Sequence, residues 1–327
     1  MQKLCTKPIK EYTPPEYSDK DTFTETEVEV GMEGWLLPGT LSLPKGNGPF
    51  PALVLVHGSG PNDRDESLGP NKPFRDLAWG LAPQNIAVLR YDKRTKIHGQ
   101  KMIAQKDAKL TVYEETIEDA LAAADLLRET ERIDTQNVFI LGHSLGGMLV
   151  PRIANADSKN TGFIIMAGPT RPIEDLFVEQ IEYISLLDGK MSNEEKANLE
   201  KIKSAVQKIK NITPENSNQM TERFLGAGAD YWLDLKGYDP AEAAKSIDRP
   251  ILILQGGRDY QVTMEDFEGW KMILSDKDNV EFKLYPAHNH LLIPGEGKCT
   301  PEQYQKLGHV DKVVIDDIVK WIEKVKK

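Results

Sequence analysis

Cysteine is scarce in this sequence, which has only Cys5 and Cys299 among 327 residues. Two thiols cannot form the disulfide framework of a small secreted domain or a cysteine-based zinc site. They could pair with each other in an oxidising compartment, but two unrelated thiols are the simpler interpretation. No spacing of His, Asp or Glu residues suggests a metal site either. The sequence therefore predicts neither a metal nor a cofactor.

Long apolar runs are also missing. No stretch approaches the 18 consecutive apolar residues that a transmembrane helix requires, so no membrane span is expected. The first residues contain no apolar segment of the kind found in secretory signals. The sequence as given therefore predicts a cytoplasmic protein, or an exported one if a signal peptide has been removed. It does not indicate an oligomeric state.

Positive charge is in deficit, with 41 Lys and Arg against 51 Asp and Glu and a net charge of −10. Binding to nucleic acid requires a basic surface, so nucleic acid is not an expected partner. The 25 glycines and 20 prolines follow no repeat period, which excludes collagen-like and solenoid architectures. The content of 39% hydrophobic and 28% charged residues is typical of a globular protein.

The sequence does contain six short apolar runs rich in β-branched residues. They lie at 52–56, 86–89, 138–141, 163–166, 251–254 and 280–284. Such runs are typical of strands that are covered on both faces. A hairpin precedes them, with one strand from Glu27 and its partner over 35–43. Helical patterns separate the runs, among them a helix opened by a capping box of Thr111 with Glu114. The alternation predicts an α/β fold with an eight-stranded, mostly parallel sheet and helices on both faces.

More than eighty residues separate the fourth run from the fifth without a convincing strand. Helical patterns fill this interval, including a capping box of Ser192 with Glu195. The patterns predict helices over about 172–188, 192–210, 214–226 and 240–245. We therefore predict three parts, an N-terminal arm or linker (1–26), a core (27–170 and 246–327) and an inserted helical cap (171–245).

The sharpest local motif is Gly142-His143-Ser144-Leu145-Gly146, between an apolar strand and a helix. A G-x-S-x-G motif in this setting is typical of a nucleophile elbow, in which serine occupies a strained turn above the sheet. Small residues on both sides of the serine let the strand and the helix approach closely. Ser144 is therefore the predicted nucleophile.

A nucleophilic serine needs a base, and the base needs an acid that orients it. In elbow enzymes the chain order is Ser, then Asp or Glu, then His. Asp259 follows the fifth run, and His288 and His290 follow the sixth. We predict Asp259 as the orienting acid and His290 as the base, with His288 as the second choice.

The tetrahedral intermediate requires an oxyanion hole. One predicted donor is the backbone N–H of Leu145, directly after the nucleophile. The other is expected in the glycine-rich loop after the first run, where we assign Ser59, with Gly60 as the alternative. His57 is predicted to anchor this loop.

Other polar residues have simpler interpretations. Asp63, Arg64 and Asp65 could meet a polar substrate, but an ion-pair network that holds the loop is favoured. Asp92 and Arg94 are predicted to be structural. Tyr231 and Trp232 could line an acyl pocket or pack within the cap.

Residues 27–327 resemble the α/β-hydrolases. The matching stretches are HGSGPNDRDE (57–66), LRYDKRT (89–95), GHSLGG (142–147), QGGRDYQV (255–262) and YPAHNHLL (285–292). They are similar to bacterial carboxylesterases and to the dienelactone-hydrolase-like and cinnamoyl-esterase-like branch. In that family the Asp of the G-x-D stretch and the final His are catalytic, which implies Asp259 and His290. Thr95 departs from the family, since relatives often carry Gly at that place.

The predicted function is that of a serine carboxylesterase acting on small to medium esters through an acyl-enzyme. The expected partner is therefore a small-molecule ester. A peptidase or amidase is the first alternative because the same triad cleaves amides, and an acyltransferase is the next. A non-catalytic binding protein of this fold would require a broken triad, and here the triad is complete in the sequence.

Overall fold

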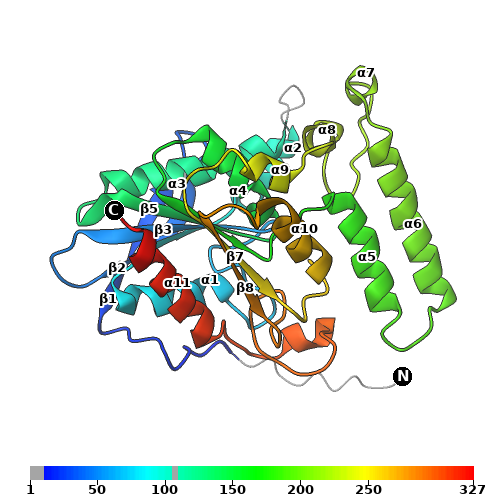
Figure 1. Cartoon of the computed structure of the whole chain (residues 1–327). Helices are drawn as coiled ribbons and strands as arrows, with labels where there is room; N and C mark the ends of the chain where they lie inside the picture. The colour runs from blue at the N-terminus through cyan, green and yellow to red at the C-terminus, as the bar shows by residue number, and fades with distance from the viewer. Residues whose placement is uncertain (1–10, 105–109) are drawn as a thin grey trace.

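The computed structural model describes residues 11–104 and 110–327, and one eight-stranded sheet forms its centre (Figure 1). The strand order is β1-β2-β4-β3-β5-β6-β7-β8. The strands are β1 Phe23–Val30, β2 Leu37–Pro44, β3 Phe50–Val56, β4 Ala87–Tyr91, β5 Ile133–His143, β6 Gly162–Met166, β7 Ile251–Gly256 and β8 Val280–Tyr285. The β1–β2 and β2–β4 pairs are antiparallel, and the other neighbouring strands are parallel. The predicted α/β fold is confirmed.

All six apolar runs form strands of this sheet, but the first hairpin begins earlier than predicted. β1 starts at Phe23, four residues before Glu27. The Phe23 ring is buried against the opposite face of the sheet from Val30. It therefore stands outside the period-two pattern of Val28 and Val30, from which the strand was predicted.

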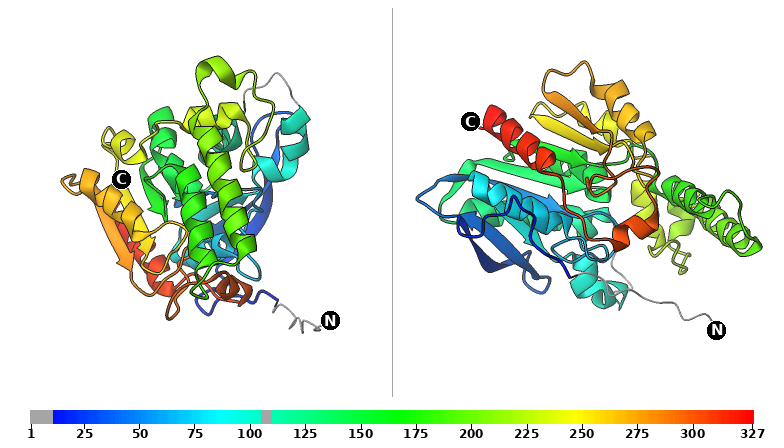
Figure 2. Two further views of the ribbon diagram at one scale, coloured as in Figure 1. Left: turned by 90° about the vertical axis from the view of Figure 1, so that its right-hand side faces the viewer. Right: turned by 90° about the horizontal axis from the view of Figure 1, so that it is seen from below.

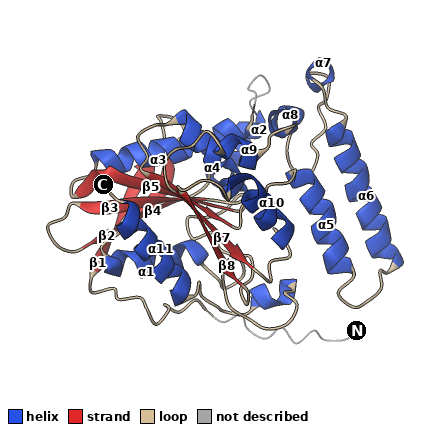
Figure 3. Ribbon diagram, in the orientation of Figure 1, coloured by secondary structure: helices blue, strands red, loops and turns tan. Residues whose placement is uncertain are grey.

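Helices cover both faces of the sheet (Figure 3). The core helices are α1 Pro73–Leu81, α2 Arg94–Ala104, α3 Glu118–Glu129, α4 Leu145–Ala156, α10 Met264–Leu274 and α11 Lys312–Val325, with short turns of helix at 82–84, 113–117 and 301–305. Leu53 and Leu55 of β3 pack with α1 and α11. Val54 and Val56 belong to the apolar cluster on the other face, to which α3, α4 and α10 also contribute. Burial on both faces explains why β3 is a continuous apolar run.

The interval between β6 and β7 is helical. Its helices are α5 Ile173–Ser185, α6 Asn193–Lys210, α7 Pro214–Ser217, α8 Ala229–Leu235 and α9 Pro240–Ala244. α5 and α6 lie side by side and project beyond the end of the sheet (Figure 2). The predicted capping box opens α6, where the Ser192 side chain accepts from the N–H of Glu195 and the Glu195 carboxylate accepts from the N–H of Ser192.

The helix predicted over 214–226 is wrong beyond its first turn. α7 ends at Ser217, and the chain then turns through a bridge between Phe224 and Ala227. Gly226 takes φ +88° in this turn, a conformation that glycine adopts without steric cost. The Arg223 guanidinium donates to the carbonyl of Gly226 and holds the turn closed.

Part of the predicted N-terminal arm packs on the core. The Tyr12 hydroxyl donates to Asp76 of α1 at 2.8 Å, and the Tyr17 hydroxyl donates to the carbonyl of Val310 at 2.7 Å. Residues 11–22 therefore contact the face that α1 and α11 cover. Cys5, the possible disulfide partner of Cys299, lies outside the described residues.

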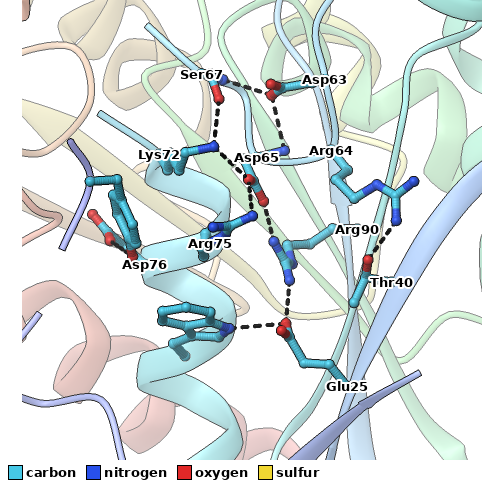
Figure 4. A network of polar contacts seen from close by, with 12 residues as sticks. Glu25, Thr40, Asp63, Arg64, Asp65, Ser67, Lys72, Arg75, Asp76 and Arg90 are labelled. Atoms are coloured by element: carbon cyan, nitrogen blue, oxygen red, sulfur yellow. Dashed lines mark hydrogen bonds and ion pairs between the residues drawn. The ribbon is translucent and has the colours of Figure 1, made fainter. Parts of the chain in front are cut away.

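A buried ion network ties the segment after β3 to the sheet (Figure 4). Arg90 of β4 donates to Asp65 and to Glu25 of β1. Asp65 also pairs with Lys72 at 3.0 Å and with Arg75 at 2.6 Å. These contacts confirm the ion-pair interpretation of Asp65.

The neighbouring residues Asp63 and Arg64 hold the segment after β3 through different contacts. The Arg64 guanidinium donates to Thr40 at 2.6 Å and to Asp92 at 3.2 Å. The Asp63 carboxylate accepts the backbone N–H groups of Asp65 and Ser67, at 3.1 and 2.9 Å. Arg64 and Asp92 form an ion pair, as predicted, whereas Asp63 holds the turn through backbone N–H groups rather than through an ion pair.

Replacing Arg90 by methionine is expected to lower the free energy of unfolding by about 3 kcal/mol, because the buried Asp65 carboxylate and the partly exposed Glu25 carboxylate lose a shared partner. The Arg90 side chain is 2% exposed. Denaturant unfolding of the variant and the parent measures the difference. As a control, Lys312→Met removes an exposed pair with Asp316 and should change stability by less than about 1 kcal/mol. Equal effects of the two substitutions would contradict a stabilising role for the network.

Within the described residues, no helix is sufficiently long and apolar to cross a membrane.

Candidate active site

Ser144 lies at the turn between β5 and α4. Its φ of +52° is in the left-handed region, which is unfavourable for a residue with a Cβ atom. A Cβ at Gly142 would collide with the carbonyl of Gly146, and a Cβ at Gly146 would collide with the carbonyl of Val56. The two glycines therefore permit the close crossing of strand and helix that holds the serine in its strained turn.

Asp259 and His290 meet at the carboxyl ends of β7 and β8. His290 Nδ1–H donates to Asp259 Oδ2 at 2.6 Å. The other oxygen of Asp259 accepts the backbone N–H groups of Gln261 and Val262, at 2.8 and 3.1 Å. The Asp259 side chain is fully buried. A proton on Nδ1 leaves Nε2 of a neutral imidazole as the acceptor, which is the tautomer a general base requires.

The second histidine has a different partner. His288 Nε2–H donates to Asp311 Oδ2 at 2.9 Å. Asp311 caps the start of α11, where its side chain accepts the N–H of Val313. The structure therefore brings His290, and not His288, to Asp259.

The loop that carries His290 is also tied to the nucleophile turn. His143 Nε2–H donates to the His290 carbonyl at 3.0 Å, and the two imidazole rings lie 4.6 Å apart between centroids. In the described part of the chain, no hydrogen bond joins Ser144 Oγ to His290. Such contacts are often long in empty sites and shorten when substrate binds.

His143 and Glu66 form a buried pair that sequence reasoning missed. His143 Nδ1–H donates to Glu66 Oε2 at 2.7 Å. Since a carboxylate and a carbonyl both accept, these two contacts favour a His143 ring that is protonated on both nitrogens and therefore carries a positive charge. Burial opposes this charge, but Glu66 and the His290 carbonyl raise the pKa of His143 above its ordinary value. Burial likewise opposes the charge of Glu66, whereas His143 lowers the pKa of that carboxyl.

The loop after β3 lies directly against the nucleophile. A Cβ at Gly58 would stand 3.0 Å from the Cβ of Ser144. The Gly58 N–H already donates to Glu66, at 2.6 Å. The next backbone N–H along the loop, that of Ser59, is therefore the first candidate for an oxyanion donor. Leu145 is the first residue of α4, where backbone N–H groups lack acceptors within the helix. The predicted oxyanion donors Ser59 and Leu145 thus each follow one of two residues, Gly58 and Ser144, that lie against each other.

His57 anchors this loop, as predicted. Its Nε2 lies 3.1 Å from the carbonyl of Asp63, and its ring packs against Phe74 and Tyr91. Burial lowers the pKa of His57 to about 4. His57 is therefore neutral at neutral pH and has a structural role.

A cavity of about 690 Å³ opens beside the loop. Its walls come from the core and from the helical insertion, and they are mostly apolar. The lining includes Ser59, Gly60, Thr95, Met102, Ile103, Glu115, Ile173, Phe177, Met220, Leu225, Tyr231 and Trp232. Tyr231 and Trp232 therefore both reach the cavity and also pack on each other. Most pockets for small molecules have this composition, an apolar wall with a few polar groups.

No group of three or more His, Cys, Asp or Glu side chains in 11–104 and 110–327 is arranged to bind a metal ion. Cys299 is buried, with its Sγ 3.6 Å from the Tyr304 hydroxyl.

Comparison with solved structures places the fold among hydrolases. Est1E from Butyrivibrio proteoclasticus aligns with a TM-score of 0.56 and 14% identity, covering 91% of this chain and 98% of that one. An esterase of Pyrococcus furiosus has a TM-score of 0.56 and 16% identity, covering 97% and 99%. An acylaminoacyl peptidase of Pyrococcus horikoshii has a TM-score of 0.58 and 17% identity, covering 94% and 42%.

Comparison of sequences is more specific. Esterase EstD of Thermotoga maritima is 47% identical to this chain over 315 residues, which cover 96% of this chain and 71% of that protein. The profile of the family described as serine aminopeptidase, S33, matches residues 52–297. This match spans β3 to the loop after β8 and includes the turn at Ser144. The chain therefore belongs to this family of α/β-hydrolases and is a serine hydrolase.

Proposed function

We propose that this protein is a serine carboxylesterase that hydrolyses small to medium esters, with Ser144 as nucleophile, His290 as base and Asp259 as orienting acid. The observation that carries the proposal is the 2.6 Å bond from His290 Nδ1–H to Asp259, on a loop that His143 ties to the Ser144 turn. The 47% identity to a protein named as an esterase supports an ester as the substrate.

In the first half-reaction, Ser144 Oγ attacks the ester carbonyl carbon while His290 Nε2 takes the hydroxyl proton. The carbonyl oxygen becomes an oxyanion, which the N–H groups of Ser59 and Leu145 stabilise. The C–O bond to the alcohol then breaks. The leaving oxygen takes the proton from His290, and the acyl group stays on Ser144.

In the second half-reaction, a water molecule replaces the alcohol. His290 takes one proton from the water as its oxygen attacks the acyl carbon, and the same donors stabilise the second oxyanion. The bond to Ser144 then breaks, and Oγ recovers its proton from His290. The products are a carboxylic acid and the unmodified enzyme. Asp259 stabilises the imidazolium in both halves without taking the proton.

We also propose that the insertion over 171–245 acts as a cap over this site. Ile173, Phe177 and Trp232 from the insertion and Ser59 from the core line one cavity. Its apolar wall favours acyl or aryl groups over charged ones. The shape of the cap would then select the substrate.

Kinetics on paired substrates test this function. We expect kcat/KM to be higher for p-nitrophenyl esters than for aminoacyl anilides, because the mostly apolar cavity wall disfavours the charged ammonium group of an aminoacyl substrate. We also expect a fluorophosphonate probe to add its phosphonyl mass to the peptide that contains Ser144. A strong preference for anilides would replace the esterase by a peptidase of the same family. A folded protein that the probe does not modify would refute the serine hydrolase mechanism itself.

A further inference from the structure

We propose that Lys93 is a positioning residue of the oxyanion hole. Its ammonium group holds the Gly58 carbonyl, and this turns the N–H of Ser59, in the same peptide unit, toward Ser144. The inference rests on the proposed reaction at Ser144 and extends it to a residue that does not touch the substrate.

Lys93 is buried and has two polar partners, which fix the position of its ammonium group. Its side chain is 2% exposed and reaches the loop from the carboxyl end of β4. Nζ donates to the Gly58 carbonyl at 2.8 Å and pairs with Glu115 Oε1 at 3.0 Å. Removing an ammonium from water costs several kcal/mol, so a lysine is held there only when its partners offset that cost. Here one partner is a carboxylate and the other is the loop beside the nucleophile.

The contact between Lys93 and the Gly58 carbonyl also sets the direction of the Ser59 N–H, because both groups belong to one peptide unit. The Gly58–Ser59 peptide is trans and planar, so its C=O and N–H bonds point to opposite sides. Strand order places β4 on one side of β3 and β5 on the other. Lys93 follows β4, whereas Ser144 follows β5. A Gly58 carbonyl drawn toward Lys93 therefore turns the Ser59 N–H toward Ser144, and this favours Ser59 over Gly60 as the donor.

The charge of Lys93 also strengthens the donor. A cation at the carbonyl oxygen polarises the peptide and increases the positive charge on its N–H, as in a chain of hydrogen bonds in a medium of low dielectric constant. The gain is largest when the substrate oxygen carries a full negative charge. It therefore lowers the energy of the transition state more than that of the bound ester.

Other hydrogen bonds also hold this loop near the end of β4, and they limit the loss of activity expected when Lys93 is replaced. Asn62 Nδ2 also donates to the Gly58 carbonyl, at 3.2 Å. The Lys93 N–H donates to the Asn62 carbonyl at 3.0 Å, and Thr95 Oγ1 donates to the Gly60 carbonyl at 3.3 Å. Thr95 is the residue that departs from the family pattern. Since the Asn62 amide remains after Lys93 is removed, the Gly58 carbonyl keeps a weaker, uncharged partner.

The experiment compares Lys93→Met, the double variant Lys93→Met/Glu115→Gln, and the exposed control Lys96→Met. For Lys93→Met we expect kcat on a p-nitrophenyl ester to fall about 10- to 100-fold with little change in KM. This is less than the 10²–10³-fold typical of losing an oxyanion donor outright. The Ki of a trifluoromethyl ketone, whose tetrahedral adduct places an oxyanion in the hole, should rise by the same factor. Lys96→Met should match the parent in both.

The double variant separates positioning from stability. Lys93→Met leaves Glu115 buried without its cation, and Glu115→Gln removes that charge. We therefore expect the double variant to recover thermal stability while kcat stays low. If kcat returns together with stability, Lys93 is only structural and the proposal is wrong. If the parent hydrolyses esters and Lys93→Met has the parental kcat and Ki, the positioning role of Lys93 is refuted while the proposed function stands. If the parent neither reacts with the fluorophosphonate nor hydrolyses esters, the proposed function fails instead.

Discussion

Replacing Ser144 by alanine should lower kcat for ester hydrolysis by about 10⁴- to 10⁶-fold, because no other group at the turn can form the acyl-enzyme. Alanine keeps the Cβ atom, so the strained φ of +52° is as costly for the variant as for the parent. The hydroxyl of Ser144 makes no hydrogen bond in the described part of the chain, so its loss should not weaken the fold. The variant is therefore expected to retain the parental melting temperature.

Steady-state kinetics, a melting curve and fluorophosphonate labelling together check this result. The matched control is Ser204→Ala, which removes a hydroxyl from an exposed position on α6. It should leave kcat and labelling unchanged. Esterase activity of the Ser144→Ala protein within tenfold of the parent would show that the nucleophile is elsewhere. Loss of activity together with unfolding would contradict the expectation that the turn tolerates alanine.

Replacing His290 by alanine is expected to have an effect of similar size, about 10⁴- to 10⁶-fold in kcat. Without the imidazole, the hydroxyl of Ser144 has no base to take its proton. Asp259 also loses the hydrogen-bond partner that it orients, so the substitution removes the base together with the contact that holds it in place. The rate of fluorophosphonate labelling should fall as well, because the probe depends on the same activated serine.

His288→Gln is the matched control, two residues away in the same loop. His288 donates to Asp311 rather than to Asp259, and a glutamine amide can replace that donor. We therefore expect kcat to remain close to the parental value, with any change confined to stability. If His288→Gln abolished activity while His290→Ala retained it, the assignment of the base would have to be reversed. The pair of variants thus tests the predicted choice of His290 over His288.

The elbow could be predicted because its causes are local. The two glycines of G-x-S-x-G are required where a strand and a helix cross closely, and both occur in the sequence next to an apolar run and a helical pattern. The order Ser144, Asp259, His290 follows from the way parallel strands bring their carboxyl ends to one edge of the sheet. The structure then places Asp259 and His290 in contact.

Glu66 and Lys93 could not be found in the same way. Each lies in a polar stretch whose charges are equally typical of a solvated loop. Their roles come from contacts across the sheet, between Glu66 and His143 and between Lys93 and the Gly58 carbonyl. Because these two charged side chains are buried, each is held in one position and can orient the group that it contacts. Burial of a side chain depends on all the elements packed around it, which a short stretch of sequence does not reveal.

The sequence by itself determined the six apolar strands of the sheet, some of the helices that cover it and the turn that holds Ser144, because hydrophobic period and glycine spacing act over a few residues. The sequence favoured His290 over His288, but only the tertiary structure supplies the physical reason, since Asp259 lies within hydrogen-bond reach of His290 and Asp311 within reach of His288. Our proposal that the Ser59 amide faces Ser144 likewise depends on the tertiary structure. That direction follows from the order of β4, β3 and β5, which no local pattern in the chain encodes.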